Sequence, residues 1–408
     1  MRVMIVVHRW LRMISYVQAL EIISSLPCSS EVTRMNLNQA LGRTLAESVT
    51  ARIPSPPFNN SAMDGYVCRW SDLTKGPLKV AGTLKAQLNH GQSFFNEQGP
   101  GTCLRITTGS PIPSWADTVV PHELVKVRGD QLIEPTSSIR LGEHIRKAGE
   151  DLAEGESILT AGTRLDPERI MLAAAFGYDV VPVVAPPRII VATSGDEIVN
   201  PGSSLPFGGI FNSNSYFLQA AINQLGLAPA HQLHLEDRLD AAVMRLREVI
   251  TPSESTLIIT TGAVSAGDTD FIPALAQTLG FEILFHKVAV RPGKPVMLAR
   301  RDNHTWLGLP GNPLATCTGW YYFGRPVLSV VAGLPQITKR TVECLNDITK
   351  PEGLRCFYRG QLSENGLRIH PKQGSAHFSA SINSNTYVEL PEGHSIVRAG
   401  TKLQALTL

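Results

Sequence analysis

The chain lacks paired cysteines, a long apolar run and an excess of charge of either sign. None of its six cysteines forms a CxxC pair or stands near a histidine at zinc-ligand spacing, which argues against a disulfide framework and a zinc site. No apolar run is long enough to span a bilayer, so we expect no membrane partner. The net charge of +2 creates no general field for a polyanion, so we expect no nucleic-acid partner. These absences favour a cytoplasmic protein with reduced cysteines.

The length of 408 residues exceeds one compact core, so two to four domains are expected. The first stretch, MRVMIVVHRWLRM, is similar to a weak signal peptide, but basic residues interrupt it and no small-residue cleavage site follows. We therefore expect residues 1–12 to be a non-native extension, with folding starting near Met13.

Hydrophobic spacing divides the chain into helical, β-rich and alternating parts. Helices are predicted over residues 15–23, 37–43 and 167–176, and short β-favouring runs broken by Gly and Pro fill residues 46–141. Residues 336–408 alternate in short runs that indicate a small β-barrel or sandwich.

From Arg188 onward, strands and helices alternate, which predicts a doubly wound α/β sheet. The predicted strands are 189–193, 230–235, 257–260, 283–290, 296–299 and 306–308, and the predicted helices are 213–225, 238–250, 272–279 and 313–331.

The stretch 260–270, TTGAVSAGDTD, connects a predicted strand to a predicted helix through small residues. Such a turn leaves backbone N–H groups open to a phosphate or an oxyanion. Ser265 adds a hydroxyl group, and Asp268 and Asp270 could either cap the helix or hold Mg²⁺ beside the anion. The stretch therefore predicts an anion-plus-metal pocket at the carboxyl end of a parallel strand.

The remaining motifs are ambiguous when each is taken alone. NSAMDGY (60–66) would be a hairpin turn, TTGSP (107–111) a hydroxyl-rich turn and RKAGED (146–151) a solvated loop. TSGDE (193–197) is either an ordinary loop or a ligand contact at a strand end. LPGNP (309–313) is a rigid turn into a helix.

The segment 286–295, HKVAVRPGKP, places three cations around a Pro/Gly turn. In an extended chain Lys287 and Arg291 would share one face. Together with Lys294, they fit a polyanionic ligand better than a merely solvated surface.

In this order and spacing, NSAMDGY, TTGSPIP, AGEDL, TSGDE, TGAVSAGDTDF, RPGKP and LPGNP resemble the molybdenum insertase family, which includes the MoeA group and the E domain of gephyrin. The resemblance runs from about Ser15 to the end. It implies a discontinuous helical, dimerisation segment (14–45 and 142–185), a β-rich domain (46–141), an α/β molybdopterin-binding domain (186–333) and a C-terminal β domain (334–408).

The resemblance also implies an activity and partners. The family forms homodimers whose cleft combines the β-rich domain of one subunit with the α/β domain of the other. The reaction takes molybdate and adenylylated molybdopterin, requires Mg²⁺ and releases AMP. Transfer complexes with molybdopterin adenylyltransferase and apo-molybdoenzymes are implied as well.

Site roles follow by position in these motifs. The catalytic candidates are Asp64, Thr108, Asp151, Glu197 and Asp270, and the metal candidates are Asp196, Asp268 and Asp270. The substrate-binding candidates are Thr261, Gly262, Ser265, Gly267, Lys287, Arg291, Lys294, Pro310 and Pro313.

Three positions depart from the family pattern that the resemblance implies. Asn59 stands where the family usually has Asp, Glu236 where it commonly has Asp, and Ala263 where it has the second Gly of SGGVS. Two alternative functions stay open. One is a non-catalytic scaffold of the gephyrin E-domain type, and the other is the adenylylation of molybdopterin. The acidic and basic positions that are retained argue against the scaffold. The α/β domain alone would suit the adenylylation of molybdopterin, but that activity would not explain the first 185 residues or the C-terminal domain.

Overall fold

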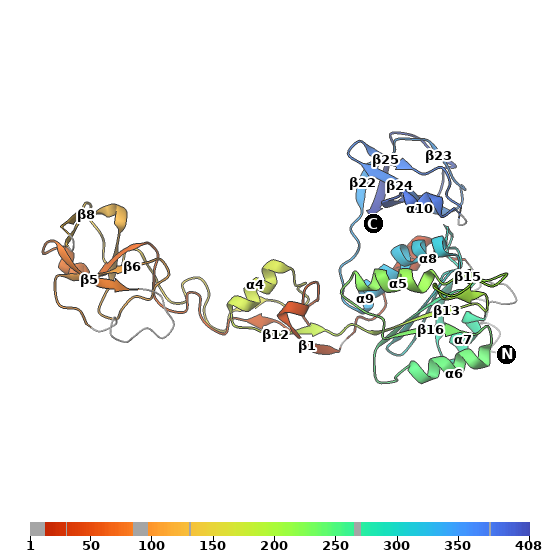
Figure 1. Ribbon diagram of the computed structural model, residues 1–408, viewed down its shortest axis with the longest axis horizontal. Helices are drawn as coiled ribbons and strands as arrows, with labels where there is room; N and C mark the ends of the chain where they lie inside the picture. Colours follow the sequence, from red (N-terminus) through yellow and green to blue (C-terminus); the bar gives the residue numbers. More distant parts are fainter. Residues whose placement is uncertain (1–12, 30, 85–96, 130–131, 265–270, 375–376) are drawn as a thin grey trace. The chain divides into compact units, whose positions relative to one another are not determined.

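The computed structural model describes residues 13–29, 31–84, 97–129, 132–264, 271–374 and 377–408 (Figure 1). The chain forms two compact units. The smaller unit comprises residues 36–39 and 47–181, and the larger unit comprises the residues up to 35, 40–46 and 182–408. The chain passes between them within β1 (Val32–Asn36) and β12 (Val180–Val184), and again near residues 39 and 46.

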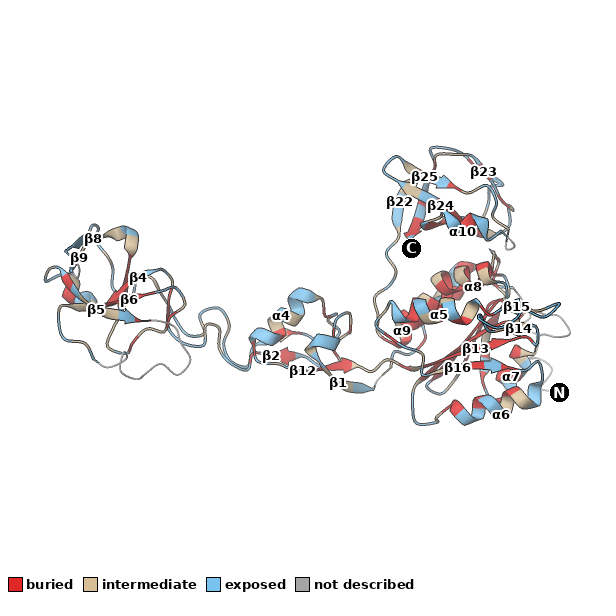
Figure 2. Cartoon of the chain, viewed as in Figure 1, coloured by how far each residue is buried: buried red, intermediate tan, exposed pale blue. Residues whose placement is uncertain are grey.

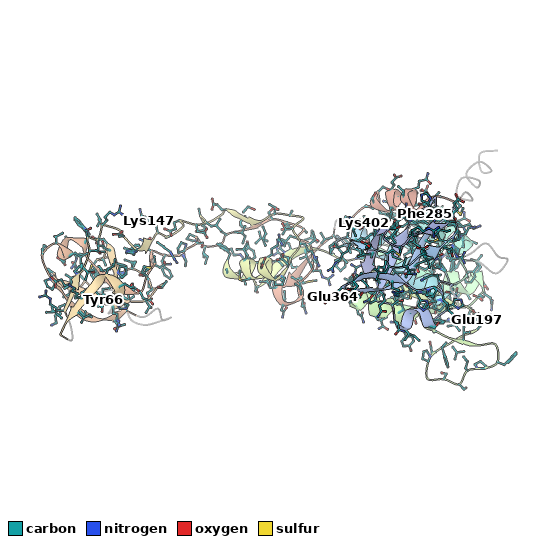
Figure 3. The ribbon with its side chains drawn as sticks, turned by 90° about the horizontal axis from the view of Figure 1, so that it is seen from above. Tyr66, Lys147, Glu197, Phe285, Glu364 and Lys402 are labelled. Carbon is teal, nitrogen blue, oxygen red and sulfur yellow. The ribbon has the colours of Figure 1, made fainter. Side chains whose placement is uncertain are left out.

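The smaller unit is built on a mixed six-stranded sheet with apolar residues on both faces. The alternation along β4 places Tyr66 and Cys68 in one core and Val67 in the other. Figure 2 colours the buried residues of this unit red, and Figure 3 labels Tyr66 within it. The strands, in the order β7-β4-β6-β5-β9-β8, are β7 (Thr118–Pro121), β4 (Gly65–Cys68), β6 (Thr102–Ile106), β5 (Leu78–Leu84), β9 (Leu132–Pro135) and β8 (Val125–Arg128).

Short strand pairs and turns complete the smaller unit. The helix α4 (Pro167–Ala175) begins at Asp166, whose side chain accepts a hydrogen bond from the backbone N–H of Arg169. The other elements are β2 (Val49–Thr50) paired with β11 (Ser157–Leu159), β3 (Asn60–Ser61) paired with β10 (Ile145–Arg146), α3 (Trp70–Leu73) and the 3₁₀ turns η1 (Leu37–Gln39) and η3 (His122–Leu124).

The larger unit contains a six-stranded sheet in the order β16-β13-β17-β21-β20-β18. The first four strands are parallel to one another. At one edge of the sheet β20 runs antiparallel to β21, and β18 runs antiparallel to β20. The strand bounds are β16 (His231–Leu235), β13 (Arg188–Ser194), β17 (Thr256–Thr261), β21 (His304–Leu309), β20 (Met297–Arg301) and β18 (Glu282–His286). The predicted α/β sheet is thus confirmed, with an antiparallel edge that the spacing does not reveal.

Helices cover both faces of this sheet, as a doubly wound fold requires. The helices α5 (Asn214–Asn223) and α9 (Arg325–Val331) lie on one face, together with the amino-terminal helix α2 (Tyr16–Ser24). The helices α6 (Leu239–Val249) and α7 (Ile272–Thr278) lie on the other face. Alternate residues of β13 point to opposite faces of the sheet. Ile189 packs in the core beneath α2, α5 and α9, and Ile190 packs in the core beneath α6 and α7.

The carboxyl-terminal part is a β domain around its own apolar core. Its main sheet has the order β19-β24-β26-β28-β22, with β25 beside β24 and a separate pair of β23 and β27. The bounds are β19 (Val290–Arg291), β22 (Arg340–Glu343), β23 (Ile348–Thr349), β24 (Arg355–Ser363), β25 (Gly366–Ile369), α10 (Ser379–Ile382), β26 (Thr386–Leu390), β27 (Ile396–Val397) and β28 (Lys402–Thr407).

Three predicted elements are wrong in detail. The helix predicted over 37–43 is the single turn η1, because the chain then enters a tight turn from Ala40 to Arg43 in which Gly42 is left-handed, with φ of 76°. The strand predicted over 283–290 ends at His286, because Lys287 takes a left-handed backbone conformation with φ of 74°. The helix predicted over 313–331 divides into α8 (Pro313–Gly319), the π-helical turn η4 (Trp320–Gly324) and α9, since Pro326 lacks the N–H group that a continuous helix needs.

Two negative predictions can be compared with the described residues. The six cysteines are all free thiols. No helix within the described ranges is both long and apolar enough to cross a membrane.

The buried His304 predicts a pH dependence of folding stability. Its side chain lies at the start of β21 and is 2% exposed, and burial, followed by the positive charge of Arg301, lowers its pKa from the usual value of 6.5. The unfolded chain therefore binds a proton at a pH where the folded chain does not. We expect the free energy of unfolding to fall as the pH drops below about 6.5, with a slope of at most about 1.4 kcal/mol per pH unit.

Urea unfolding of wild type and of His304→Phe at several pH values between 5 and 8 measures this effect. The phenylalanine variant should lose the part of the pH dependence that His304 contributes. Identical pH profiles for the two proteins would show that His304 does not titrate differently on folding.

Candidate active site

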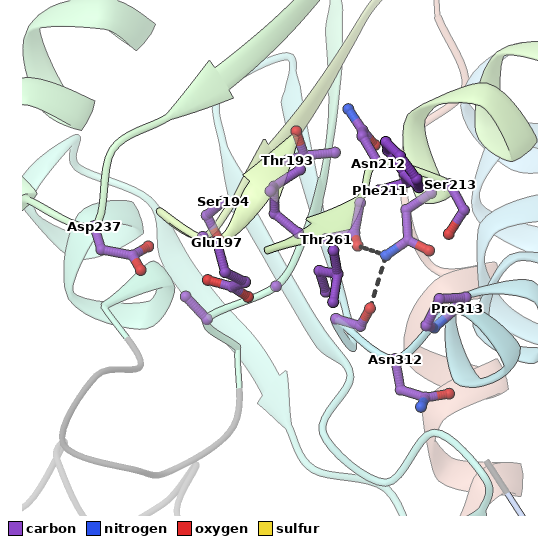
Figure 4. Close-up of a pocket in the computed structure, with 17 residues that line it drawn as sticks. Thr193, Ser194, Glu197, Phe211, Asn212, Ser213, Asp237, Thr261, Asn312 and Pro313 are labelled. Atoms are coloured by element: carbon purple, nitrogen blue, oxygen red, sulfur yellow. Dashed lines mark hydrogen bonds between the residues drawn. The ribbon is translucent and has the colours of Figure 1, made fainter. Parts of the chain in front are cut away.

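A pocket of about 530 Å³ lies in the larger unit, where the parallel strands β13 and β17 end. This is the position at which open α/β sheets bind ligands. Figure 4 shows Glu197 and Asp237 on one side of the pocket and Asn312 and Pro313 on the other. Its lining comprises residues 193–195, 197–198, 210–214, 237, 261–263 and 311–313.

The polar floor of the pocket is held together by Asn214 in the first turn of α5. Its side-chain amide donates to the hydroxyl oxygen of Thr261 at 2.6 Å and to the carbonyl oxygen of Gly311 at 2.8 Å (Figure 4). The Thr261 hydroxyl in turn donates to the carbonyl of Pro310 at 3.3 Å. One amide thus fixes the ends of two parallel strands in a single geometry.

Gly262 and Ser194 meet at the bottom of the pocket. Gly262 has φ of 98°, and a Cβ atom built on it would lie 2.7 Å from both the backbone carbonyl oxygen and the Oγ of Ser194. The Oγ of Ser194 is buried and has no hydrogen-bond partner among the described residues. A buried hydroxyl without a partner is unfavourable, so this atom is placed for a bound ligand to satisfy.

Ala263 departs from the family glycine at a position where the backbone is left-handed, with φ of 45°. An L-residue is strained in this region by about 1–2 kcal/mol, and glycine recovers that strain while losing about 0.5–1 kcal/mol of chain entropy. We expect Ala263→Gly to raise the free energy of unfolding by about 0.5–1 kcal/mol. Denaturant unfolding measures the change.

A matched substitution controls for the general effect of glycine. Ala241→Gly, in the ordinary helical backbone of α6, should destabilise by about 1 kcal/mol. If both variants lose stability equally, the backbone at Ala263 carries no strain.

Three carboxylates gather beside the pocket. The Glu197 carboxylate lies over Gly195, since a Cβ atom on that glycine would approach both carboxylate oxygens at 2.8 Å. The backbone N–H of Asp237 points at a carboxylate oxygen of Asp196, 3.5 Å away. Partial burial raises the pKa of Asp237, and the negative charges of Asp196 and Glu197 raise it further. An added cation would relieve this repulsion.

The described residues contain no set of three His, Cys, Asp or Glu side chains arranged to hold a metal ion together. Mg²⁺ commonly takes only one or two protein carboxylates, with water and substrate phosphates as its other ligands. One or two of the carboxylates of Asp196, Glu197 and Asp237 could therefore contribute to a Mg²⁺ site, with a bound phosphate and water as its other ligands.

The predicted cations lie outside this pocket. Lys287 and Arg291 do not share an extended face, because the left-handed backbone at Lys287 turns the chain. Arg291 instead lines a separate cavity of about 410 Å³ with Lys350 and Tyr358 of the carboxyl-terminal domain. Lys294 is exposed, and the adjacent Gly293 lies against the first turn of α8.

The other predicted positions in this region have mixed outcomes. Thr261, Gly262, Glu197 and Pro313 line the pocket, whereas Asp196 and Pro310 lie next to lining residues. Ser265, Gly267, Asp268 and Asp270 lie outside the described residues.

In the smaller unit, Asp64 and Thr108 form a direct pair. One carboxylate oxygen of Asp64 accepts from the backbone N–H of Thr108 at 2.7 Å and from its hydroxyl at 2.9 Å. These two hydrogen bonds, with the backbone bond first, lower the pKa of Asp64. The pair is exposed, so its charge is available to a ligand.

Asp151 lies in a second exposed patch of the same unit. Its carboxylate accepts from the Ser55 hydroxyl at 3.2 Å, and its backbone N–H donates to the Ser55 carbonyl at 3.0 Å. Nearby, the side-chain oxygen of Asn59 accepts from the N–H of Ala148 at 2.9 Å. An amide oxygen can accept this hydrogen bond as a carboxylate oxygen would, so the local structure accommodates Asn59.

Sequence reasoning left Asn214, Asn312, Asp237 and Phe211 out of the site. Asp237 lines the pocket, whereas its neighbour Glu236 does not. Asn312 caps α8, its side-chain oxygen accepting from the N–H groups of Leu314 and Ala315. A signal was present for two of them, since Asn214 and Asn312 each stand where a predicted helix begins and asparagine is a common cap.

The larger unit is thus a doubly wound α/β domain with a polar pocket at the carboxyl edge of its parallel strands, where domains of this class bind their ligands. Three family models cover nearly the whole chain. They are the MoeA N-terminal region (domain I and II) over residues 14–177, a probable molybdopterin-binding domain over residues 190–330 and the MoeA C-terminal region (domain IV) over residues 341–408. The chain belongs to the MoeA family of molybdopterin molybdenumtransferases.

Full-length relatives agree with this assignment. The chain is 33% identical to the molybdopterin molybdenumtransferase of Synechococcus elongatus, over 97% of this chain and 100% of that protein. It is 31% identical to that of Haemophilus influenzae, over 93% and 95% of the two chains. A crystal structure of the molybdopterin biosynthesis MoeA protein from Pyrococcus horikosii matches with a TM-score of 0.78 and 25% identity, over 97% and 99% of the two chains.

Proposed function

We propose that the protein is a cytoplasmic molybdenum insertase of molybdenum cofactor biosynthesis. It takes molybdate and adenylylated molybdopterin, places molybdenum on the dithiolene and releases AMP. The observation that carries the proposal is the pocket at the ends of β13 and β17, in a chain that matches the MoeA family from residue 14 to its end. Its relatives are named for the same transfer.

The floor of the pocket binds the phosphate groups in this proposal. Gly262 and Gly311 leave their backbone open because neither carries a side chain, and a Cβ atom on Gly311 would crowd Gly262 at 3.2 Å. The unpartnered hydroxyl of Ser194 donates to a phosphate oxygen. Asn214 holds this floor rigid, so the substrate meets donors that are already oriented.

On the carboxylate side of the pocket, Asp196 and Asp237 would hold Mg²⁺, and the ion would neutralise charge at the pyrophosphate. Cleavage breaks the phosphoanhydride bond between AMP and the molybdopterin phosphate by attack of water. Glu197, exposed beside the pocket, accepts the proton of that water. Positioning and charge neutralisation supply most of the rate, as in phosphoryl transfer generally.

The protein acts as a homodimer in this proposal, and each cleft needs two patches. One patch contains Glu197 of the larger unit, and the other contains Asp64, Thr108 and Asp151 of the smaller unit of the second copy. The carboxylates and hydroxyl of the smaller unit are exposed and hydrogen-bonded into fixed positions, as a contributed patch requires.

A turnover assay with three substrate mixtures tests the proposal. Purified protein with adenylylated molybdopterin, Mg²⁺ and molybdate should release AMP, and omission of molybdate or Mg²⁺ should suppress the release. An adenylyltransferase would instead consume ATP and molybdopterin and release pyrophosphate. A scaffold would do neither, so absence of AMP release would overturn the proposed activity.

A further inference from the structure

One wall of the pocket is apolar, which the chemistry of phosphates, carboxylates and Mg²⁺ does not require. Ile198, Ile210 and Phe211 line the pocket from β14 (Ile198–Val199) and β15 (Ile210–Phe211). Phe211 is 45% exposed and Ile210 is 50% exposed, although large apolar side chains gain free energy by burial. The wall therefore offers an apolar surface to whatever occupies the pocket.

The wall is held in place by backbone hydrogen bonds. β14 and β15 pair in parallel, with Ile198 opposite Ile210 and Val199 opposite Phe211. The N–H of Ile210 donates to the carbonyl of Glu197 at 2.9 Å, and the N–H of Asn212 donates to that of Val199 at 2.8 Å. The residues on both sides of Phe211 are thus hydrogen-bonded to the segment that carries Glu197 and Val199, and Figure 4 labels Phe211 among the lining residues.

The Phe211 ring lacks an aromatic partner within the described part of the chain, although ring pairs stabilise the nearby core. Phe217 of α5, six residues further on, packs edge to face against Tyr321 with ring centroids 6.1 Å apart. An aromatic face that is free, half exposed and beside a phosphate-binding floor suits a ligand with a flat ring and an anionic group.

We propose that Phe211 is a specificity-determining residue, which stacks on a flat nitrogen heterocycle of the substrate. The inference rests on the proposed function, because adenylylated molybdopterin carries two such rings, a pterin and an adenine, each linked to phosphate. With the phosphate on the floor formed by Ser194 and Gly262, the ring lies against Phe211. Binding energy from the ring then positions the phosphoanhydride beside Glu197.

Three probes separate the ring from the phosphate. They are AMP, ribose 5-phosphate and a pterin phosphate, each titrated calorimetrically in the presence of Mg²⁺. Phe211→Ala should weaken whichever ring probe uses the wall by roughly 5- to 150-fold, and ribose 5-phosphate by less than about twofold. Phe211→Trp should restore binding, and Phe211→Leu should not, because leucine retains apolar area without an aromatic face.

Phe207→Ala is the matched control, because Phe207 lies in the same β14–β15 connection, is fully exposed and does not line the pocket. Melting temperatures of all variants check that each one is folded. Selective loss of AMP binding would assign the wall to adenine, and selective loss of pterin phosphate binding would assign it to the pterin. An equal loss for ribose 5-phosphate, or no loss for either ring, would overturn the inference.

The turnover assay on wild type distinguishes the two failures. If wild type releases AMP and Phe211→Ala binds every probe normally, the stacking role is wrong and the proposed function stands. If wild type binds no probe and releases no AMP, the proposed function itself fails, and the inference fails with it.

Discussion

A mixture of two inactive variants, Asp64→Ala and Glu197→Ala, is expected to recover about a quarter of the wild-type activity. Each single variant should lose about 10²- to 10³-fold in turnover, the usual effect of removing one preorganised polar group. Suppose that each cleft combines the smaller unit of one copy with the larger unit of the other. A mixed dimer then has one cleft in which Asp64 and Glu197 are both intact and one cleft in which both are replaced by alanine. Random assortment makes half of the dimers mixed, which gives a quarter of the clefts.

The measurement is AMP release by the two variants after they are co-expressed with different affinity tags. The matched control mixes Asp64→Ala with Asp151→Ala. These residues belong to the same unit, so every cleft of a mixed dimer lacks one of them and no recovery is expected. Recovery in the control, or its absence in the first mixture, would contradict the shared cleft.

Gly262→Ala is expected to lower the free energy of unfolding by about 2–4 kcal/mol and to block ligand binding. The backbone conformation at φ of 98° strains any residue with a Cβ atom, and the added methyl would lie 2.7 Å from the carbonyl oxygen and the Oγ of Ser194. Because Ser194 belongs to the buried strand β13, its carbonyl oxygen cannot move away without shifting the sheet. Denaturant unfolding and AMP titration measure the two effects.

Gly202→Ala separates the steric contact from the backbone strain. Gly202 has a similar φ of 93°, but a Cβ atom there would meet no atom within 4 Å. It should lose only about 1 kcal/mol. A loss at Gly262 no larger than at Gly202 would show that the pocket floor relaxes freely around an added methyl.

The strands and helices of the α/β domain follow from local patterns that a sequence carries directly. Arg188–Ser194 and Thr256–Thr261 are apolar, β-branched runs buried on both faces, and such runs form central parallel strands. The helix at residues 239–249 has the spacing that buries one side, and it was predicted within a residue at each end. Where the pattern failed, backbone conformation at one residue decided the result, as at Lys287 and Pro326.

Only some residues of the candidate site could be predicted from local sequence patterns. Glu197, Thr261 and Gly262 lie in motifs at predicted strand ends, and the carboxyl ends of parallel strands meet at one edge of the sheet. Pro313 was predicted only from the family resemblance. Asp237 and Phe211 were missed because their participation depends on distant pairings. The ends of β16 and β13 bring Asp237 to Asp196, and the register of β14 with β15 brings Phe211 to the pocket.

The sequence by itself determined the family and the order of the elements in the α/β domain, and it predicted that Thr261, Gly262 and Glu197 lie at the edge where the pocket is found, because motif spacing and hydrophobic period are local properties. Tertiary structure alone decided the rest. It separated Arg291 from the pocket by pairing β19 with β24, left the Ser194 hydroxyl without a partner among the residues that the structure describes, and exposed Phe211. These features depend on which segments meet in space, and contacts between residues far apart along the chain leave no local pattern to detect.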